Sequence, residues 1–207
     1  LDLGSISGSC LNAGIIGTIC CAMMFLPGMV ATGTTVAAFF LTVGFCFYGM
    51  NPLNLLPFVL GVFVYSRIKR QPFAKFVNFA MFSTALAPLI SEVLFRYPGT
   101  ETHGITLLGV ALALLIGVVT GCAMPALCAH SPGFHKGYDL YNAGPAAGFL
   151  CFLFFAVMYK TLGIEAPAIA ATLGEGNWAF VNVFCIITFA LCIVAGFFLS
   201  GKSFKGY

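Results

Sequence analysis

Long apolar runs separated by short polar stretches dominate the pattern along this chain. Seven such runs can be traced, at residues 9–26, 33–49, 51–66, 73–95, 104–128, 140–159 and 178–200. Their apolar residues are continuous and do not alternate with polar ones, which excludes the strands of a transmembrane barrel. A helix needs about 20 mostly apolar residues to cross the hydrocarbon core of a bilayer. The pattern therefore predicts an all-α membrane protein, a polytopic helical bundle of about seven segments.

The composition supports the same conclusion. Hydrophobic residues make up 60% of the 207 and charged residues only 7%, whereas soluble domains carry about 25% charged residues. With a mean hydropathy of +1.04, the surrounding solvent must be largely hydrocarbon, where every backbone polar group needs an internal partner. The nine cysteines are expected to pack as small apolar residues. No metal, other cofactor or nucleic acid is expected.

The third apolar run is short and contains two prolines. Residues 51–57 read Asn-Pro-Leu-Asn-Leu-Leu-Pro, and each proline removes a backbone hydrogen-bond donor. We therefore expect a broken or partly unwound helix near 51–57.

Basic residues are distributed unevenly between the two ends of the segments. If all seven segments span the membrane, one side carries seven cations and the opposite loops carry only Arg96 and Lys160. The seven are Arg67, Lys69, Arg70, Lys75, Lys136, Lys202 and Lys205. Cytoplasmic loops of membrane proteins are enriched in Lys and Arg. The loops at 67–72 and 130–138 and the C-terminal tail are therefore expected on the cytoplasmic side of a bacterial inner membrane.

Two stretches of the chain resemble each other. Asn-Ala-Gly at 12–14 recurs at 142–144, and Gly-x-x-Phe-x-Gly at 44–49 recurs at 201–206. The first triplet opens segment one and the second opens segment six, so the two copies would run through the membrane in opposite directions. Inverted repeats of this kind occur in transporters, with the substrate site near broken helices. The alternative is a coincidence of small residues used for helix packing.

The repeat suggests how the chain is organised. A single transmembrane domain is expected over residues 1–207, with a first repeat at about 9–66, linking helices at 73–128 and the start of a second repeat at about 138–207. The first Gly-x-x-Phe-x-Gly leads into the proline-rich segment, whereas the second is followed only by Tyr207. The sequence is therefore expected to be a fragment of a longer protein.

Polar side chains within the apolar runs are the candidates for a solute-binding site, which is expected between residues 51–57, residues 84–92 and the region of Asn142. A carboxylate inside a membrane segment usually faces a cavity or a partner, so Glu92 is the first candidate, with Thr84 on the same helix. The alternative for Glu92 is a pair with Arg96, four residues on. Four asparagines lie at segment starts or breaks: Asn12, Asn51, Asn54 and Asn142. Their amides either cap helices or offer donors and acceptors to a polar solute.

Four stretches of the chain together carry a family resemblance. They are residues 12–14, 44–61, 84–92 and, most specifically, 135–142, which read His-Lys-Gly-Tyr-Asp-Leu-Tyr-Asn. In these stretches the chain resembles the domain-of-unknown-function 1576 family of bacterial integral-membrane proteins. Pro145 departs from that family's pattern, in which a bulkier apolar or a small residue is expected. The resemblance implies a bacterial membrane protein and a chain shorter than the family's members, but no activity.

The sequence thus favours membrane transport of a small polar solute by a channel or a secondary transporter. No enzyme is expected, because the sequence contains no His-Glu-x-x-His or Gly-x-Ser-x-Gly motif. A non-catalytic membrane subunit or sensor is the alternative, and a membrane-embedded enzyme is less favoured. The expected partners are the lipid bilayer and a small polar solute or ion, and a homo-oligomer is compatible with the sequence.

Overall fold

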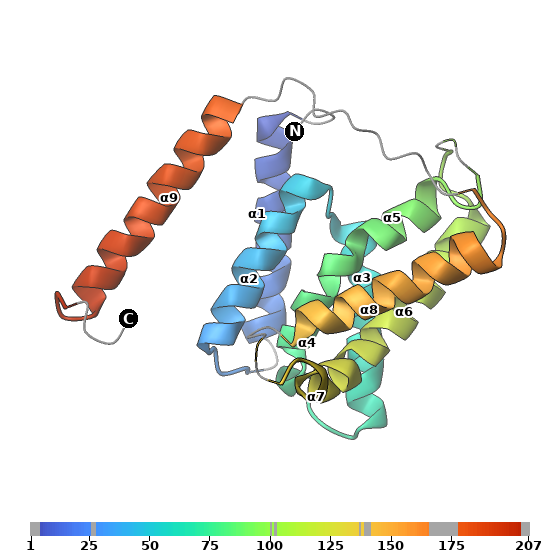
Figure 1. The fold of residues 1–207 in the computed structure, drawn as a ribbon, viewed down its shortest axis with the longest axis horizontal. Coiled ribbons are helices and arrows are strands. Elements are labelled where there is room, and N and C mark those ends of the chain that lie inside the picture. The colour runs from blue at the N-terminus through green and yellow to red at the C-terminus, as the bar shows by residue number, and fades with distance from the viewer. Residues whose placement is uncertain are drawn as a thin grey trace. The chain divides into compact units, whose positions relative to one another are not determined.

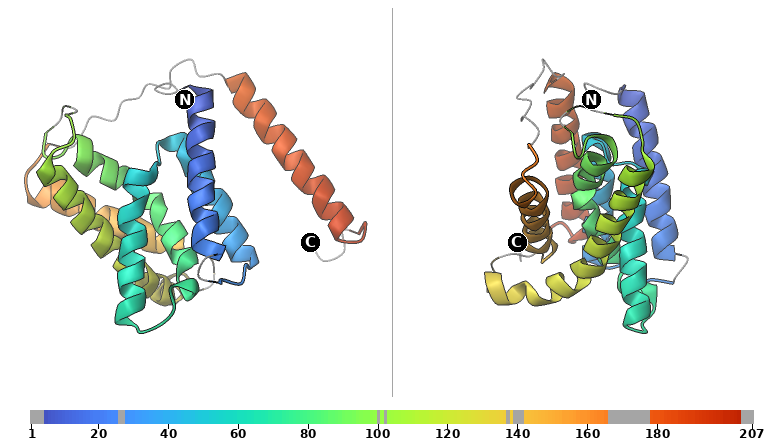
Figure 2. Two further views of the ribbon diagram at one scale, coloured as in Figure 1. Left: turned by 180° about the vertical axis from the view of Figure 1, so that it is seen from behind. Right: turned by 90° about the vertical axis from the view of Figure 1, so that its right-hand side faces the viewer.

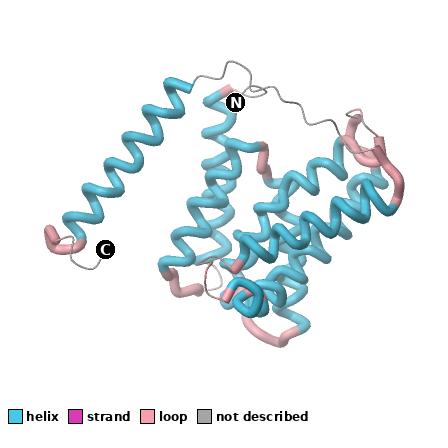
Figure 3. The backbone as a smooth tube through the Cα atoms, in the orientation of Figure 1, coloured by secondary structure: helices cyan, strands magenta, loops and turns pink. Residues whose placement is uncertain are grey.

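The computed structural model describes the chain as helices joined by loops (Figures 1 and 3). The described residues are 5–25, 28–99, 101, 103–136, 138, 142–165 and 178–203, and no strand occurs among them. The chain divides into two units, the first ending at Ala168 and the second containing helix α9.

The first two helices correspond to the first two apolar runs. α1 (Ile6–Phe25) is followed by α2 (Gly33–Phe45), which continues into a 3-10 turn, η1 (Cys46–Tyr48). Thr32 caps α2, because its hydroxyl accepts a hydrogen bond from the backbone N–H three residues on and so satisfies a free donor of the first turn. η1 ends at Gly49, whose φ of 94° lies in the left-handed region that glycine adopts without strain.

The third segment is one continuous helix, α3 (Pro52–Ile68), so the expected break at 51–57 is wrong. Pro52 occupies the first turn, where the N–H that proline lacks has no partner within the helix. Pro57 lies inside the helix and removes one hydrogen bond, yet the helix continues through it. The backbone is non-helical only just before Pro52, at residues 49–51.

The interruption lies instead in the fourth segment. α4 (Val77–Ser83) and α5 (Ala87–Phe95) are separated by a 3-10 turn, η3 (Thr84–Leu86). In a regular α-helix the Thr84 carbonyl would accept a hydrogen bond from the N–H of residue 88, which is a proline. The N–H of the residue before Pro88 donates to this carbonyl instead, and the shorter bond produces the 3-10 turn.

The remaining elements of the first unit complete the bundle. A 3-10 turn, η2 (Phe73–Lys75), precedes α4, and α6 (Leu107–His130) is followed by the single-turn helix α7 (Pro132–His135). α8 (Ala143–Phe155) ends in a π-helical turn, η4 (Ala156–Thr161). Most of the buried apolar side chains described in this unit form one cluster.

α3 and α6 pack closely against each other where they cross (Figure 2). A Cβ atom at Gly61 of α3 would meet the Val118 carbonyl oxygen, and one at Gly121 of α6 would meet the Phe58 carbonyl oxygen. Gly117, one turn before Gly121, faces Pro57 in the same way. Small residues four apart let membrane helices approach closely. These three glycines therefore permit a contact that leaves no room for a methyl group.

The described part of the second unit consists mainly of α9 (Trp178–Leu199). Its residues are almost all apolar, and most of its described side chains are exposed. A helix that is apolar all round is typical of a membrane-spanning segment.

Five helical stretches are long and apolar enough to cross a membrane: Ser7–Phe25, Val77–Phe95, Leu107–His135, Ala143–Thr161 and Asn182–Leu199. Two shorter apolar helices, Gly33–Tyr48 and Pro52–Ile68, bring the segments in the described part of the chain to seven. The predicted all-α class and the seven segments are confirmed, and the five long helices indicate an integral membrane protein. The inverted repeat stays a prediction.

Candidate solute-binding site

The turn before α3 brings together two of the predicted asparagines. Asn51 Oδ1 accepts hydrogen bonds from the N–H groups of Leu53 (2.9 Å) and Asn54 (3.3 Å), and Asn54 Oδ1 accepts one from the Asn51 N–H (2.8 Å). Both side-chain amides donate to the Gly49 carbonyl, at 3.3 and 3.2 Å. The two asparagines therefore cap α3 reciprocally, which agrees with the capping interpretation of these residues.

The same turn is tied to two other helices. Asn54 Nδ2 donates to Ser91 Oγ of α5 at 2.8 Å, and Asn12 Nδ2 of α1 donates to the Met50 carbonyl at 2.6 Å. Asn54 is only 1% exposed, so its polar atoms depend on these partners rather than on solvent. Three of the four predicted asparagines thus meet at one turn, although they come from different helices.

A cavity of about 380 Å³ lies beside this turn. One wall comes from the end of η1 and the turn, and the other comes from α5 and the residue after it. The lining residues are Tyr48, Gly49, Asn51, Pro88, Ser91, Glu92, Phe95 and Arg96. They offer amide, hydroxyl, carboxylate and guanidinium groups beside aromatic rings. A small polar molecule can be bound by a few convergent polar groups of this kind in a partly apolar cavity.

Glu92 lies in the wall of the cavity and has two polar partners. Its Oε1 accepts a hydrogen bond from the Tyr159 hydroxyl of η4 at 2.7 Å, and its Oε2 lies 3.6 Å from the Arg96 guanidinium. The side chain of Glu92 is 22% exposed and that of Arg96 is 31% exposed. Glu92 therefore pairs with Arg96 along its helix and also lines a cavity, and its role in solute binding stays a prediction.

Thr84 is not part of the cavity lining. It is buried in η3, where its hydroxyl donates to the Met81 carbonyl and lies 3.5 Å from the Thr42 hydroxyl of α2. Thr42 donates to the same carbonyl at 3.2 Å. Thr84 lies about 12 Å before Glu92 at 1.5 Å of rise per residue. Its hydrogen bonds hold the interrupted segment against α2.

Asn142 also lies apart from the other predicted residues. Its Oδ1 is 2.7 Å from His135 Nε2, and its carbonyl accepts a hydrogen bond from the Ser131 hydroxyl at 3.0 Å. From Asn142 to Tyr159 the chain is helical and rises about 25 Å at 1.5 Å per residue. Asn142 is thus at the opposite end of α8 from the Tyr159–Glu92 contact, and the expected grouping with residues 51–57 does not form.

Several residues of this geometry were not among the predicted site residues, Gly49 and Tyr159 among them. Gly49 supplies the carbonyl that both capping amides share, and Tyr159 supplies the hydroxyl that binds Glu92. A tyrosine near the end of an apolar segment signals a position at the membrane interface, but that signal does not name its partner. Among the described residues, no group of three or more His, Cys, Asp or Glu side chains could hold a metal ion.

Comparison with known proteins identifies a family and no individual relative. No curated protein and no solved structure matches the chain. The model of one family, a protein of unknown function (DUF1576), matches residues 1–160. This range contains all the lining residues of the cavity and Tyr159, whereas α9 follows it. Of the most specific motif, 135–142, residues 137 and 139–141 lie outside the described residues. Because the match covers more than half of the 207 residues, the chain belongs to the DUF1576 family of proteins of unknown function.

Proposed function

We propose that this chain is part of a channel or secondary transporter that moves a small polar solute across a bacterial inner membrane. The observation that supports the proposal is the polar cavity beside residues 49–51, in a chain whose helices are otherwise apolar. Ionisable side chains in membrane segments are costly and occur mainly where they line a solute path or face a partner. The cavity is the proposed solute-binding site.

The charges of the site favour a neutral or zwitterionic solute. Glu92 already has a counter-charge in Arg96 and a hydrogen-bond donor in Tyr159. A simple cation or anion would leave one charge of the site uncompensated in a medium of low dielectric constant, which is unfavourable. A zwitterion or a neutral amide can satisfy both charged groups at once.

The proposal includes the membrane orientation predicted from the basic residues. With the loop at 67–72 and the C-terminal tail in the cytoplasm, the cavity lies toward the other side, because Asn51 and Arg67 are at opposite ends of α3. The inverted repeat belongs to the same proposal, with Asn12 and Asn142 at corresponding positions.

The test is uptake of radiolabelled solutes into proteoliposomes that contain the protein. The first panel holds zwitterionic amino acids, neutral amides and monovalent cations, each with and without a proton gradient. Glu92→Gln keeps the shape of the side chain but removes its charge, and we expect it to reduce uptake at least tenfold, as about 1.4 kcal/mol of lost binding corresponds to a factor of ten. Glu101→Gln is the matched control, because Glu101 is exposed and does not line the cavity.

Two outcomes would count against this function. Equal uptake by the wild-type protein and Glu92→Gln would remove the cavity from the transport path. Absence of uptake for every solute, from protein that elutes as a folded species, would favour the membrane subunit or sensor.

A further inference from the structure

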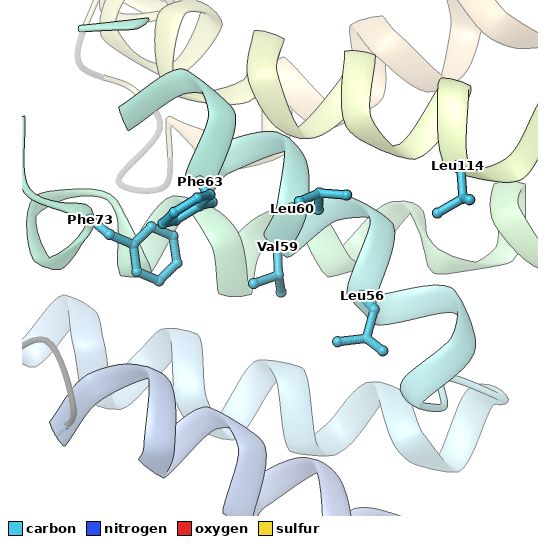
Figure 4. A pocket seen from close by; sticks show the side chains of 6 residues that line it. All are labelled: Leu56, Val59, Leu60, Phe63, Phe73 and Leu114. Atoms are coloured by element: carbon cyan, nitrogen blue, oxygen red, sulfur yellow. The ribbon is translucent and has the colours of Figure 1, made fainter. Parts of the chain in front are cut away.

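A second cavity of about 380 Å³ lies on the surface of α3, away from the polar site. Its lining residues are Leu56, Val59, Leu60, Phe63, Phe73 and Leu114. Four of them lie on α3, Phe73 lies on η2 and Leu114 lies on α6, as Figure 4 shows. The rings of Phe63 and Phe73 contact each other edge to face, with centroids 5.9 Å apart. We refer to these six residues as the α3 groove.

The α3 groove is part of an exposed apolar stripe. Leu56, Leu60 and Phe63 follow one another at spacings of four and three residues, which places them on one face of the helix. They are 52%, 46% and 38% exposed. The opposite face of α3 packs against α6 through Gly61. The stripe therefore faces the surroundings of the first unit and, in a membrane, hydrocarbon.

The stripe ends at a group of three cations. Arg67 follows Phe63 by one helical turn, and its guanidinium lies over the Phe63 ring at 5.0 Å from the centroid. Lys69 lies over the Tyr65 ring at 5.7 Å, and Arg70 follows it. All three cations are exposed. In the part of the chain that the structure describes, no salt bridge joins any of them to a carboxylate.

Arg70 occupies a backbone position that normally favours glycine. Its φ is 53°, in the left-handed region, and it follows the last residues of α3, where the N–H of Gln71 donates to the Ser66 carbonyl at 3.0 Å. Glycine is the usual residue at this position of such a helix end. A long cationic side chain is thus present where the backbone alone would favour glycine, which has no Cβ atom.

The distance between the groove and the cations fits one lipid leaflet. From Leu56 to Arg67 the helix rises about 16 Å at 1.5 Å per residue. One leaflet contributes about half of the roughly 30 Å hydrocarbon core of a bilayer. An acyl chain in the groove would therefore place its own headgroup at the level of the three cations.

We propose that the α3 groove and its three cations form a binding site for one anionic phospholipid. An acyl chain lies along Leu56, Leu60 and Phe63, and the phosphate lies against Arg67, Lys69 and Arg70. The apolar groove alone would accept any lipid, so the cations provide the preference for a negative headgroup. This site is independent of the proposed transport function, because it shares no lining residue with the polar cavity.

The first test uses the unmodified protein. Native mass spectrometry of the protein released from micelles of equal phosphatidylglycerol and phosphatidylcholine should show a retained lipid that is mainly phosphatidylglycerol. A cation near an anionic lipid surface changes affinity by about fivefold, so Arg67→Gln/Arg70→Gln should reduce the preference by about 25-fold. Lys160→Gln/Lys202→Gln is the matched control, because it removes two exposed cations outside the groove, and its preference should equal that of the wild-type protein.

The second test locates the lipid in the groove. With the single tryptophan removed (Trp178→Phe), Phe63→Trp places a fluorophore beneath Arg67. Brominated phosphatidylglycerol should quench it more strongly than brominated phosphatidylcholine at the same mole fraction, and the difference should disappear in Arg67→Gln/Arg70→Gln. Equal quenching by both lipids would overturn the proposal. So would the absence of quenching by either lipid, which would indicate that protein rather than lipid covers the groove.

Discussion

Asn54 is the polar side chain on which the turn before α3 most depends. It is buried and joins the backbone of Asn51, the carbonyl of Gly49 and the hydroxyl of Ser91. Without the amide the Asn51 N–H and the Ser91 hydroxyl would each lose this partner, whereas the Gly49 carbonyl would keep the Asn51 amide. An unsatisfied buried polar group costs about 1–3 kcal/mol. One residue therefore stabilises a helix start and one wall of the cavity together.

Asn54→Ala should lower the free energy of unfolding by about 3 kcal/mol, because more than one buried group loses a hydrogen bond at once. The measurement is thermal unfolding in detergent with a thiol-reactive dye, which reports the exposure of the buried Cys20, Cys46 and Cys128. The control is Asn78→Leu. The Oδ1 atom of Asn78 is buried without a hydrogen-bond partner, so this change should not destabilise the protein. A similar loss of stability in both variants would contradict the role of the Asn54 hydrogen bonds.

Tyr159→Phe should lower the free energy of unfolding by about 1 kcal/mol. The hydroxyl donates to a charged carboxylate, a bond that contributes about 1.5–3 kcal/mol when shielded, and the partial exposure of Glu92 reduces this value. Tyr65→Phe is the matched control, since the Tyr65 ring makes contacts with Lys69 and Phe76 but its hydroxyl has no hydrogen bond among the described residues. The same dye assay compares the two, and equal midpoints would refute the role of the Tyr159 hydroxyl.

Residue type predicted the candidates for the site better than it predicted their grouping. Asn12, Asn51, Asn54 and Glu92 lie at or beside one turn, because amides and carboxylates in an apolar chain need partners and are brought together by that need. Thr84 and Asn142 also carry polar side chains, but these have other partners, the Met81 carbonyl and the His135 ring. Which partner is in reach depends on how the helices pack, and spacing along the sequence does not contain that information.

At the scale of the helix, glycines at the contact between α3 and α6 allow the two helices to pack closely. Gly61, Gly117 and Gly121 bring the two backbones into contact, and in lipid such contacts depend on close packing rather than on the hydrophobic effect. The contact also fixes the direction of α3, and with it the turn at 49–51.

Gly121→Ala should destabilise the protein by about 2 kcal/mol or more, because the new methyl group has to displace backbone atoms of α3. Gly148→Ala in α8 should instead stabilise the protein. Gly148 is exposed with nothing within 4 Å of its Cβ position, and alanine is favoured over glycine in a helix by about 1 kcal/mol. Thermal unfolding of the two variants checks the difference, and two effects of the same sign would contradict the close contact.

The lengths of the segments were predictable, whereas the position of the broken one was not. Apolar length is set by the bilayer, so the runs in the sequence correspond to the helices. Proline content indicated a break at 51–57, but Pro52 begins a helix and Pro57 is tolerated within one. Pro88 coincides with the interruption because it has no N–H to donate, and the Thr84 carbonyl accepts a hydrogen bond from the Ala87 N–H instead. A proline therefore removes one hydrogen bond of the helix backbone, but its presence alone does not determine where the helix ends.

At the scale of the whole molecule, basic residues follow helix C-termini. Three non-glycine residues in the described part of the chain have positive φ, namely Arg70, Lys136 and Lys202, and each comes after the end of a helix. Cations interact favourably with the negative end of a helix dipole. All three belong to the side that the sequence predicts to be cytoplasmic. The same residues therefore interact with helix C-termini and contribute to the predicted orientation.

Reporter fusions test that orientation. A reporter that fluoresces only in the cytoplasm should be active after Arg70 and after Ser131, which are separated by two predicted crossings. A phosphatase that is active only outside should be active after Leu162, one crossing further on, because Lys and Arg are retained on the cytoplasmic side. Activity of the same reporter at all three positions would show that α8 does not cross the membrane.

The contact between Tyr159, in the π-helical turn at the end of α8, and Glu92 depends on the number of residues that precede Tyr159 in the helix. In η4 the N–H of Leu162 donates to the Val157 carbonyl, five residues back, one more than in an α-helix. Because each residue turns a helix by about 100°, loss of any single residue between Ala143 and Tyr159 would swing the phenol away from the carboxylate. An in-frame deletion of one codon would thus separate a pair that conservative substitutions along the same helix would leave intact.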